Sequence, residues 1–197
     1  MKNPFQRSQG KKIQPSNQSF SNLPSTGSPV YIMEPRLQSA FAQSNGLQRD
    51  YNEDALLTIE CSVTYQDLIR NVGIYAIADG MGGHLHGEIA SKVALTSLAS
   101  TLIERFLLPQ FNPSSSQPQN SFLSILKESV LIAHQEVLEK ASGGGTTLTC
   151  CLIVAQTLSI AHIGDSRAYY IGENGEIKLY TRDHSLVKRL VELGQIS

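Results

Sequence analysis

The order of apolar and polar positions divides the chain into strands, then helices, then strands again. Residues 72–78 form a short, almost uninterrupted apolar run of the kind found in buried strands. Residues 87–107 and 121–141 repeat apolar positions at helical spacing, and a polar, proline-containing loop over 109–120 separates them. This grouping predicts an α+β domain with helices packed on antiparallel sheet, rather than an alternating βαβ fold.

Shorter segments on both sides complete the pattern. Strands are predicted over 36–43 and 55–59, ahead of the first helix. After the glycines at 143–145, further elements are expected: strands over 146–155, 157–163, 167–171 and 176–180, hairpin-turn residues at 172–175, and a last helix over 185–193 that stops at Gly194.

Composition separates a tail from the folded part. Residues 1–30 are rich in Ser, Gln, Asn and Pro and lack a periodic apolar pattern. Such a segment cannot bury enough apolar surface to offset its ordering entropy, so a disordered tail is expected. The folded domain is predicted to occupy residues 31–197.

Charge and cysteine usage limit the partners and the compartment. A net charge of −1 gives no reason to expect binding to nucleic acid or to an anionic membrane surface. No apolar stretch approaches the ~20 residues that span a membrane. Cys61, Cys150 and Cys151 form no Cys-x-x-Cys pair, so they are interpreted as reduced thiols. A cytoplasmic location is therefore predicted.

The sequence Asp79-Gly80-Met81-Gly82-Gly83 lies between the strand over 72–78 and the helix over 87–107. Glycine admits unusual backbone angles and lets a ligand approach the main chain closely. A carboxylate beside exposed backbone groups suits a hard metal ion and a phosphate. A plain turn needs fewer glycines than the three found here, so the motif taken alone favours a functional site modestly.

Three further clusters of chemically active residues occur along the domain: Arg49-Asp50-Tyr51-Asn52-Glu53-Asp54, Gly145-Thr146-Thr147, and Gly164-Asp165-Ser166-Arg167 followed by Asp183-His184-Ser185. Each has a plain explanation as a solvated turn, a hairpin or a helix N-cap. Together, however, they fall at predicted strand ends, where they can converge at one edge of a sheet sandwich. Asp and Glu oxygens without thiolate partners suit Mg²⁺ or Mn²⁺, and Arg49 offers a planar fork for a phosphate.

With these motifs in this order, the sequence resembles the PP2C-type (PPM) metal-dependent serine/threonine protein phosphatases, in particular their bacterial branch. The resemblance runs from about residue 36 to the C-terminus. It implies an antiparallel β-sandwich flanked by helix pairs. The motifs that carry it are Arg49-x-x-Asn52-Glu53-Asp54, Asp79-Gly80-Met81-Gly82-Gly83-x-x-x-Gly87-Glu88-x-Ala90-Ser91, Gly145-Thr146-Thr147, Gly164-Asp165-Ser166-Arg167-x-Tyr169 and Asp183-His184-Ser185.

The resemblance also implies metal ligands. Asp79 matches the carboxylate that bridges two catalytic Mn²⁺ or Mg²⁺ ions, and the carbonyl group of Gly80 matches a ligand of one of them. Glu53 and Asp54 match the surroundings of the first ion, with Asp54 acting through water or outer contacts. Asp165 matches the carboxylate that helps to bind a third, looser ion.

Substrate and chemistry follow from the same comparison. Arg49 matches the arginine that holds the substrate phosphate, and the implied substrates are phosphoproteins made by serine/threonine kinases. Water activated by the metal ions attacks phosphoserine or phosphothreonine without a phosphoenzyme intermediate. The Gly145-Thr146-Thr147 and Ser166-Arg167 segments match structural positions.

The sequence departs from the family pattern in two places. Met81 stands where eukaryotic members have a histidine, and the nearby His84 and His86 are assigned solvated or packing roles. The Ser-Asp-Gly and terminal Asp-Asn motifs that supply further metal-binding aspartates do not occur. The domain is therefore expected to be partial and to lack the C-terminal strands and helix of the family.

Two alternatives to an active phosphatase stay open at this point. One is a catalytically inactive phosphatase-like module that binds phosphoproteins or regulatory partners. The other is a P-loop-type nucleotide binder built on the glycines at 80–83, which the absence of a following Gly-Lys-Ser/Thr disfavours.

Overall fold

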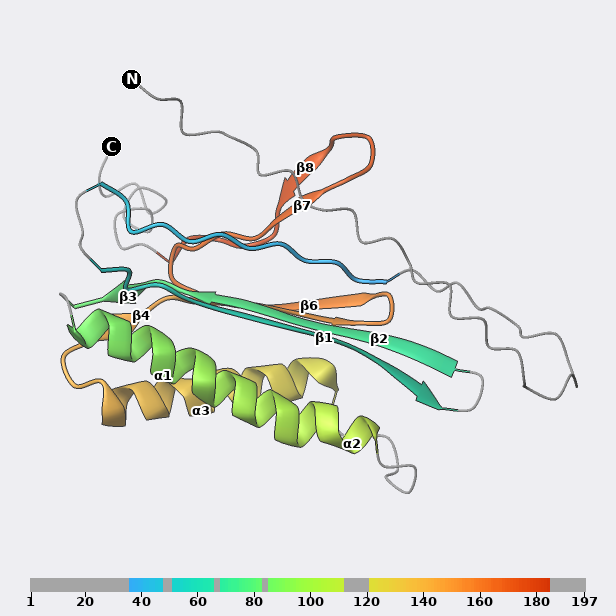
Figure 1. Ribbon diagram of the computed structural model, residues 1–197, viewed down its shortest axis with the longest axis horizontal. Coiled ribbons are helices and arrows are strands. Elements are labelled where there is room, and N and C mark those ends of the chain that lie inside the picture. The colour runs from blue at the N-terminus through green and yellow to red at the C-terminus, as the bar shows by residue number, and fades with distance from the viewer. Residues whose placement is uncertain (1–35, 48–50, 66–67, 83–84, 112–120, 185–197) are drawn as a thin grey trace, which may run out of the picture. The chain divides into compact units, whose positions relative to one another are not determined.

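The two longest strands form an antiparallel hairpin, β1 (Ala55–Tyr65) and β2 (Leu68–Ala78) (Figure 1). The computed structural model describes residues 36–47, 51–65, 68–82, 85–111 and 121–184. The predicted strands over 55–59 and 72–78 are confirmed, but both were predicted too short. Polar residues such as Glu60 and Ser62 interrupt the apolar run in sequence, although their backbones continue the ladder opposite Gly73 and Asn71.

The hairpin continues into a four-stranded sheet with the order β1-β2-β5-β6, in which every pairing is antiparallel. β6 (Thr157–Ile163) has the predicted bounds. The strand predicted over 146–155 is divided into β4 (Gly145–Thr146) and β5 (Leu148–Val154), because at Thr147 the chain passes from a two-stranded sheet into the four-stranded sheet. The predicted α+β class with antiparallel sheet is confirmed.

Both predicted long helices are present. α1 (Leu85–Leu102) passes into a π-helical turn, η1 (Ile103–Leu107), and into α2 (Leu108–Gln110). α3 (Phe122–Lys140) begins after Ser121, whose hydroxyl oxygen accepts a hydrogen bond from the Ser124 N–H at 3.2 Å. α1 and α3 contact each other and lie along the same face of the sheet (Figure 1).

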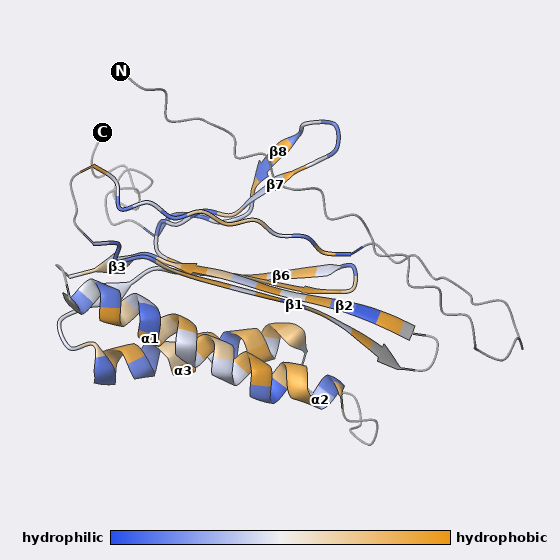
Figure 2. Ribbon diagram, viewed as in Figure 1, coloured by the Kyte–Doolittle hydropathy of each residue, from blue (hydrophilic) through white to orange (hydrophobic). Residues whose placement is uncertain are grey.

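The core lies between these helices and the inner face of the sheet. Alternate residues of β2 and β5 point toward the helices, since side chains of a strand alternate between faces. Figure 2 shows the apolar residues grouped on α1, α3 and the adjoining strands. The fully buried members include Val72, Ile74, Leu98, Leu102, Phe106, Leu126, Cys150 and Leu152.

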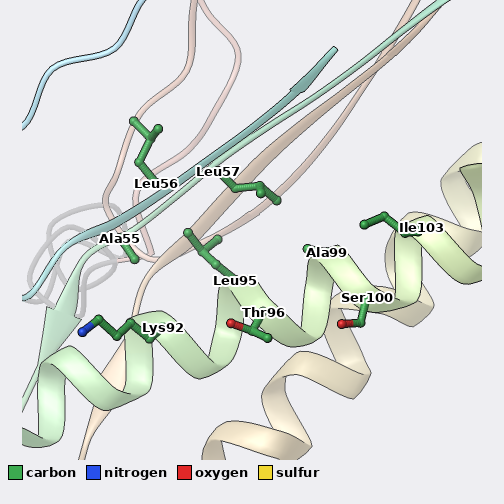
Figure 3. A pocket seen from close by; sticks show the side chains of 9 residues that line it. All are labelled: Ala55, Leu56, Leu57, Lys92, Leu95, Thr96, Ala99, Ser100 and Ile103. Carbon is green, nitrogen blue, oxygen red and sulfur yellow. The ribbon is translucent and has the colours of Figure 1, made fainter. Parts of the chain in front are cut away.

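An open groove of about 350 Å³ runs between β1 and α1 at the edge of this core. Leu57 and Leu95 point into it, while Leu56 lies on the other side of β1 (Figure 3). The amino group of Lys92 lies at one end of the groove and forms an ion pair with Glu88, one helical turn away. The groove is therefore part of the contact between strand and helix and carries little polar chemistry.

The predicted strand over 36–43 is wrong, because residues 36–45 pair with no strand. This segment instead lies across the outer face of the sheet: a Cβ on Gly73 would lie 2.8 Å from Leu37 Cδ1. Leu37 is partly buried by this contact, whereas the other apolar residues of the segment, such as Phe41, are exposed. The segment therefore contacts the face of the sheet and does not pair with its edge, as the strand prediction had required.

Two small ladders complete the described structure. β3 (Gly80–Met81) pairs with β4, and β7 (Tyr169–Ile171) pairs with β8 (Ile177–Leu179). The predicted hairpin turn at 172–175 is confirmed by Gly175, which has φ +82°, and by its N–H, which donates to the Gly172 carbonyl at 2.9 Å.

Two further predictions lie outside the described residues: the tail over 1–30 and the helix over 185–193. Among the helices that the structure describes, none combines the length and apolar character needed to cross a membrane. Cys61, Cys150 and Cys151 are all free thiols. Burial raises the pKa of the Cys150 thiol to about 12, whereas Cys151 faces the other side of β5 and is half-buried.

Candidate active site

Asp79 follows the last residue of β2, and two hydrogen bonds to Thr147 hold its backbone there. The Thr147 N–H donates to the Asp79 carbonyl at 2.9 Å, and the Asp79 N–H donates to Thr147 Oγ1 at 3.0 Å. The next residue, Gly80, pairs with Thr146 in the β3–β4 ladder. The glycine-rich turn predicted from sequence is thus a two-residue strand, clamped by the Gly145-Thr146-Thr147 motif.

Glycines bring three segments close together around Gly80. A Cβ on Gly80 would lie 2.3 Å from the Gly87 carbonyl oxygen and 2.6 Å from the Glu53 carbonyl oxygen. A Cβ on Gly87 would lie 2.5 Å from Glu53 Oε2. Real Cβ atoms essentially never come this close to other atoms. The Glu53 carboxylate therefore lies in space that Gly87 leaves free, and the Glu53 carbonyl lies in space that Gly80 leaves free.

The Glu53 segment is fixed from the helix side. The Ser91 hydroxyl of α1 donates to the Glu53 carbonyl at 2.6 Å, and both residues are buried. Asp54 is exposed, and its N–H donates to Asn52 Oδ1 at 2.9 Å in a local turn. The adjacent carboxylates therefore differ: the Glu53 carboxylate is directed toward Gly87, and the Asp54 carboxylate lies at the surface. The place where Glu53, Gly80 and Gly87 meet is called the Gly80 corner below.

The loop after β6 approaches the same corner through Thr147. Gly164 has φ +107°, and a Cβ there would lie 2.6 Å from Thr147 Cγ2. The Ser166 hydroxyl lies 2.8 Å from Thr147 Oγ1. Asp165, between these two contacts in sequence, is exposed.

An ion pair fixes the far side of this loop. Arg167 donates to both carboxylate oxygens of Asp183, at 3.0 and 2.6 Å, and these bonds, with a contact to Tyr169, raise the pKa of its guanidinium. The His184 N–H also donates to the Gly164 carbonyl at 2.7 Å. Residues 164–167 are thereby connected to both Thr147 and the segment 183–184.

The predicted site residues are only partly brought together. Glu53 and Gly80 meet at one corner, while Asp54, Asp79 and Asp165 are exposed. Arg49 lies outside the described residues. Within the described part of the chain, no three His, Cys, Asp or Glu side chains gather closely enough to hold a metal ion by themselves.

The donors at this corner nevertheless fit a hard cation in kind. Glu53 and Asp79 offer carboxylate oxygens and Gly80 a backbone carbonyl, with no thiolate among them. Oxygen donors of this kind match Mg²⁺ and Mn²⁺, which retain waters and need few protein ligands. The described donors are thus of the kind that divalent cations bind.

Sequence reasoning missed the contacts that support the corner. It treated Gly145-Thr146-Thr147 as structural in a general sense and gave no role to Gly87 or Ser91. The available signal was spacing: Gly87 and Ser91 lie four residues apart, so both project from the same side of α1 toward the Glu53 segment. Of the nearby histidines, His86 is exposed and its carbonyl packs on Gly144, whereas His84 lies outside the described residues.

Comparisons with known proteins place the chain in a family. The protein phosphatase 2C family profile matches residues 40–191. The serine/threonine phosphatase Stp of Listeria monocytogenes is 32% identical over 161 residues, which are 82% of this chain and 60% of that protein. The serine/threonine protein phosphatase PstP of Mycobacterium tuberculosis is 31% identical over 167 residues, covering 82% of this chain and 28% of PstP.

Solved structures agree. The crystal structure of Mycobacterium tuberculosis PstP/Ppp superposes with a TM-score of 0.54 at 32% identity, covering 77% of this chain and 57% of that one. The PstP catalytic domain in complex with two manganese ions gives a TM-score of 0.53 at 32% identity, covering 77% and 58%. The chain belongs to the protein phosphatase 2C family. It spans about 60% of the length of the Listeria relative that it matches.

Proposed function

We propose that the chain hydrolyses phosphoserine and phosphothreonine in proteins with the help of Mn²⁺ or Mg²⁺. The observation that carries the proposal is buried Glu53, whose carboxylate lies against Gly87 and whose backbone carbonyl lies against Gly80, the residue after Asp79. Membership of the protein phosphatase 2C family supports the reaction class. A structure of the related PstP catalytic domain holds two manganese ions, which supports the choice of metal.

The proposed roles follow the family motifs. Asp79 and the Gly80 carbonyl would hold the catalytic ions, and Glu53 and Asp54 would complete the surroundings of the first ion. Burial of Glu53 strengthens its attraction to a cation, because fewer waters screen the charge. The bound ions would supply an activated water and neutralise charge on the phosphoryl group.

Two further residues complete the proposal. Arg49 is assigned to the substrate phosphate, because its guanidinium can donate two parallel hydrogen bonds to phosphate oxygens. Asp165 is assigned to a third, more weakly held ion. In the reaction, the bond between phosphorus and the serine or threonine oxygen breaks, a bond to a water oxygen forms, and the side-chain oxygen leaves with a proton.

Phosphoproteins made by serine/threonine kinases are the proposed substrates, and a cytoplasmic location stays a prediction. The alternative of an inactive binding module gains no support from the relatives, which are named as phosphatases. The comparisons give no support to nucleotide binding either.

The decisive experiment combines turnover with metal binding. The purified chain is expected to hydrolyse p-nitrophenyl phosphate and a phosphothreonine peptide when Mn²⁺ is present, and to stop when EDTA is added. Asp79→Asn is expected to lower kcat by at least about 100-fold, because a carboxylate that contacts the reacting centre is lost. Glu173→Gln, in the exposed β7–β8 turn, is the matched control and should behave as the unmodified chain does.

Calorimetric titration with Mn²⁺ tests the site without relying on turnover. The unmodified chain should bind Mn²⁺, and Asp79→Asn should bind it more weakly. Turnover that Asp79→Asn leaves intact, or a folded chain that binds no Mn²⁺, would contradict the proposal. Mn²⁺ binding without hydrolysis of either substrate would instead favour the inactive module.

A further inference from the structure

Thr147 lies between the two loops that carry the proposed metal-binding aspartates. β5 stands between β2 and β6 in the sheet. Ile77 pairs with Thr149 on one side of β5, and Leu148 pairs with Ile163 on the other. Continuing both registers past the strand ends brings Thr147 opposite Asp79 on one side and opposite Gly164 on the other.

The contacts of Thr147 agree with this position. Its N–H and Oγ1 form hydrogen bonds with the carbonyl and the N–H of Asp79, at 2.9 and 3.0 Å. Its methyl group packs on Gly164, where a Cβ would lie 2.6 Å away, and its hydroxyl lies 2.8 Å from Ser166 Oγ. Thr147 is 2% exposed, so water does not replace these contacts.

The available protons decide how the hydroxyl groups are connected. The Asp79 amide is a donor, so Thr147 Oγ1 accepts from it. The same oxygen lies 2.8 Å from Ser166 Oγ, and in this pair either hydroxyl can donate to the other. A chain of two hydrogen bonds then runs from the Asp79 amide through Thr147 to Ser166, the neighbour of Asp165. These specific hydrogen bonds, rather than packing alone, connect the two loops.

From this connection we propose that Thr147 is a positioning residue that couples the Asp79 corner to the Asp165 loop. A divalent cation bound at either the Asp79 corner or the Asp165 loop restrains that segment. The hydrogen bonds of the Thr147 hydroxyl then restrain the other segment as well. The inference rests on the proposed function, because it takes Asp79 and Asp165 as metal-binding residues. It assigns to Thr147 the coupling between their two sites, in place of a general structural role.

Mn²⁺ titration of four chains tests the coupling: the unmodified chain, Thr147→Val, Asp165→Asn and the double variant. Thr147→Val keeps the shape and removes the hydroxyl. In the unmodified background, Asp165→Asn is expected to weaken the tightest Mn²⁺ site by at least about 5-fold, the lower end of typical coupling between sites. In the Thr147→Val background the same change should have an effect of less than about 2-fold, as a double-mutant cycle measures.

Companion variants separate positioning from stability. Thr147→Ser keeps the hydroxyl and should retain the coupling, whereas Ser166→Ala should abolish it even if Thr147→Val fails to fold. Thr101→Val removes another buried threonine hydroxyl, which donates to Ser97 within α1, and should leave Mn²⁺ affinity and coupling unchanged.

The possible results distinguish the two proposals. Coupling that survives in Ser166→Ala, or fully additive effects of Thr147→Val and Asp165→Asn, would overturn the role of Thr147 and leave the proposed function standing. A folded, unmodified chain that binds no Mn²⁺ would overturn both. Loss of coupling in Ser166→Ala together with its retention in Thr147→Ser is the expected result.

Discussion

The inner face of the sheet and the Gly80 corner are held together in different ways. The inner face packs against fully buried side chains of the helices, such as Leu98 of α1 and Phe106 of η1. The corner contains backbone atoms, glycines and single hydrogen bonds around Glu53 and Asp79. Packing of many side chains distributes stability over a large area, whereas the corner depends on a few close approaches. Substitutions in the core should therefore lower stability in proportion to the side-chain volume that they remove. Substitutions at the corner should mainly affect metal binding.

The largest loss of stability is expected on the inner face. Leu126→Ala in α3 should lower the free energy of unfolding by about 3 kcal/mol, because it removes buried methyl groups and leaves a cavity. Leu138→Ala is the matched control on the same helix: Leu138 is 65% exposed, so its loss should be less than about 1 kcal/mol. Urea unfolding followed by circular dichroism measures both. Equal losses would contradict the assignment of the buried face of α3.

A methyl group added at the corner should have the next largest effect. Gly80→Ala introduces a Cβ 2.3 Å from the Gly87 carbonyl oxygen and should destabilise the chain by about 2 kcal/mol through overpacking. Gly145→Ala adds the same group 3.7 Å from Met81 Cε, an ordinary contact, and is the control in the adjoining strand. Urea unfolding and Mn²⁺ titration should both separate the two variants. If both behave alike, the close approach at Gly80 is not a constraint.

Two buried serines, one in each region, allow the same substitution to be compared. Ser91 donates to the Glu53 carbonyl, and Ser129 donates to the Ile125 carbonyl within α3. Ser91→Ala and Ser129→Ala should each lower the free energy of unfolding by about 1 kcal/mol. Only Ser91→Ala should also weaken Mn²⁺ binding, because it releases the Glu53 segment. Weaker Mn²⁺ binding in Ser129→Ala as well would mean that general stability controls the corner.

The last prediction concerns the pH dependence of stability and the buried thiol of Cys150. Burial raises its pKa from 9.0 to about 12, so the unfolded chain releases this proton at lower pH than the folded chain. The stability contribution is therefore complete below pH 9 and is lost as pH rises toward 12, at up to about 1.4 kcal/mol per pH unit. Unfolding measured at pH 8 and pH 10 should show a steeper loss for the unmodified chain than for Cys150→Ala. Equal slopes would indicate that Cys150 is accessible to water.

The elements and their order could be predicted from sequence because local patterns encode them. The helical period of apolar residues predicted α3 within one residue at each end, and β6 was predicted with its observed bounds. Strand length was less predictable, because polar outer-face residues such as Glu60 belong to β1 although they interrupt its apolar run. The prediction for the segment over 36–43 failed for another reason: Leu37 contacts the face of the sheet at Gly73, and the segment pairs with no strand.

The sequence by itself determined the family motifs, the α+β class and the acidic character of the candidate site, since these depend on residue types and local spacing. Only the tertiary structure decided which motif supports which. It paired Gly80 with Thr146, directed Glu53 toward Gly87 while leaving Asp54 exposed, and placed Thr147 between Asp79 and Ser166. These contacts join residues 19 to 68 positions apart in the chain. They arise from strand order and register, which no local pattern specifies.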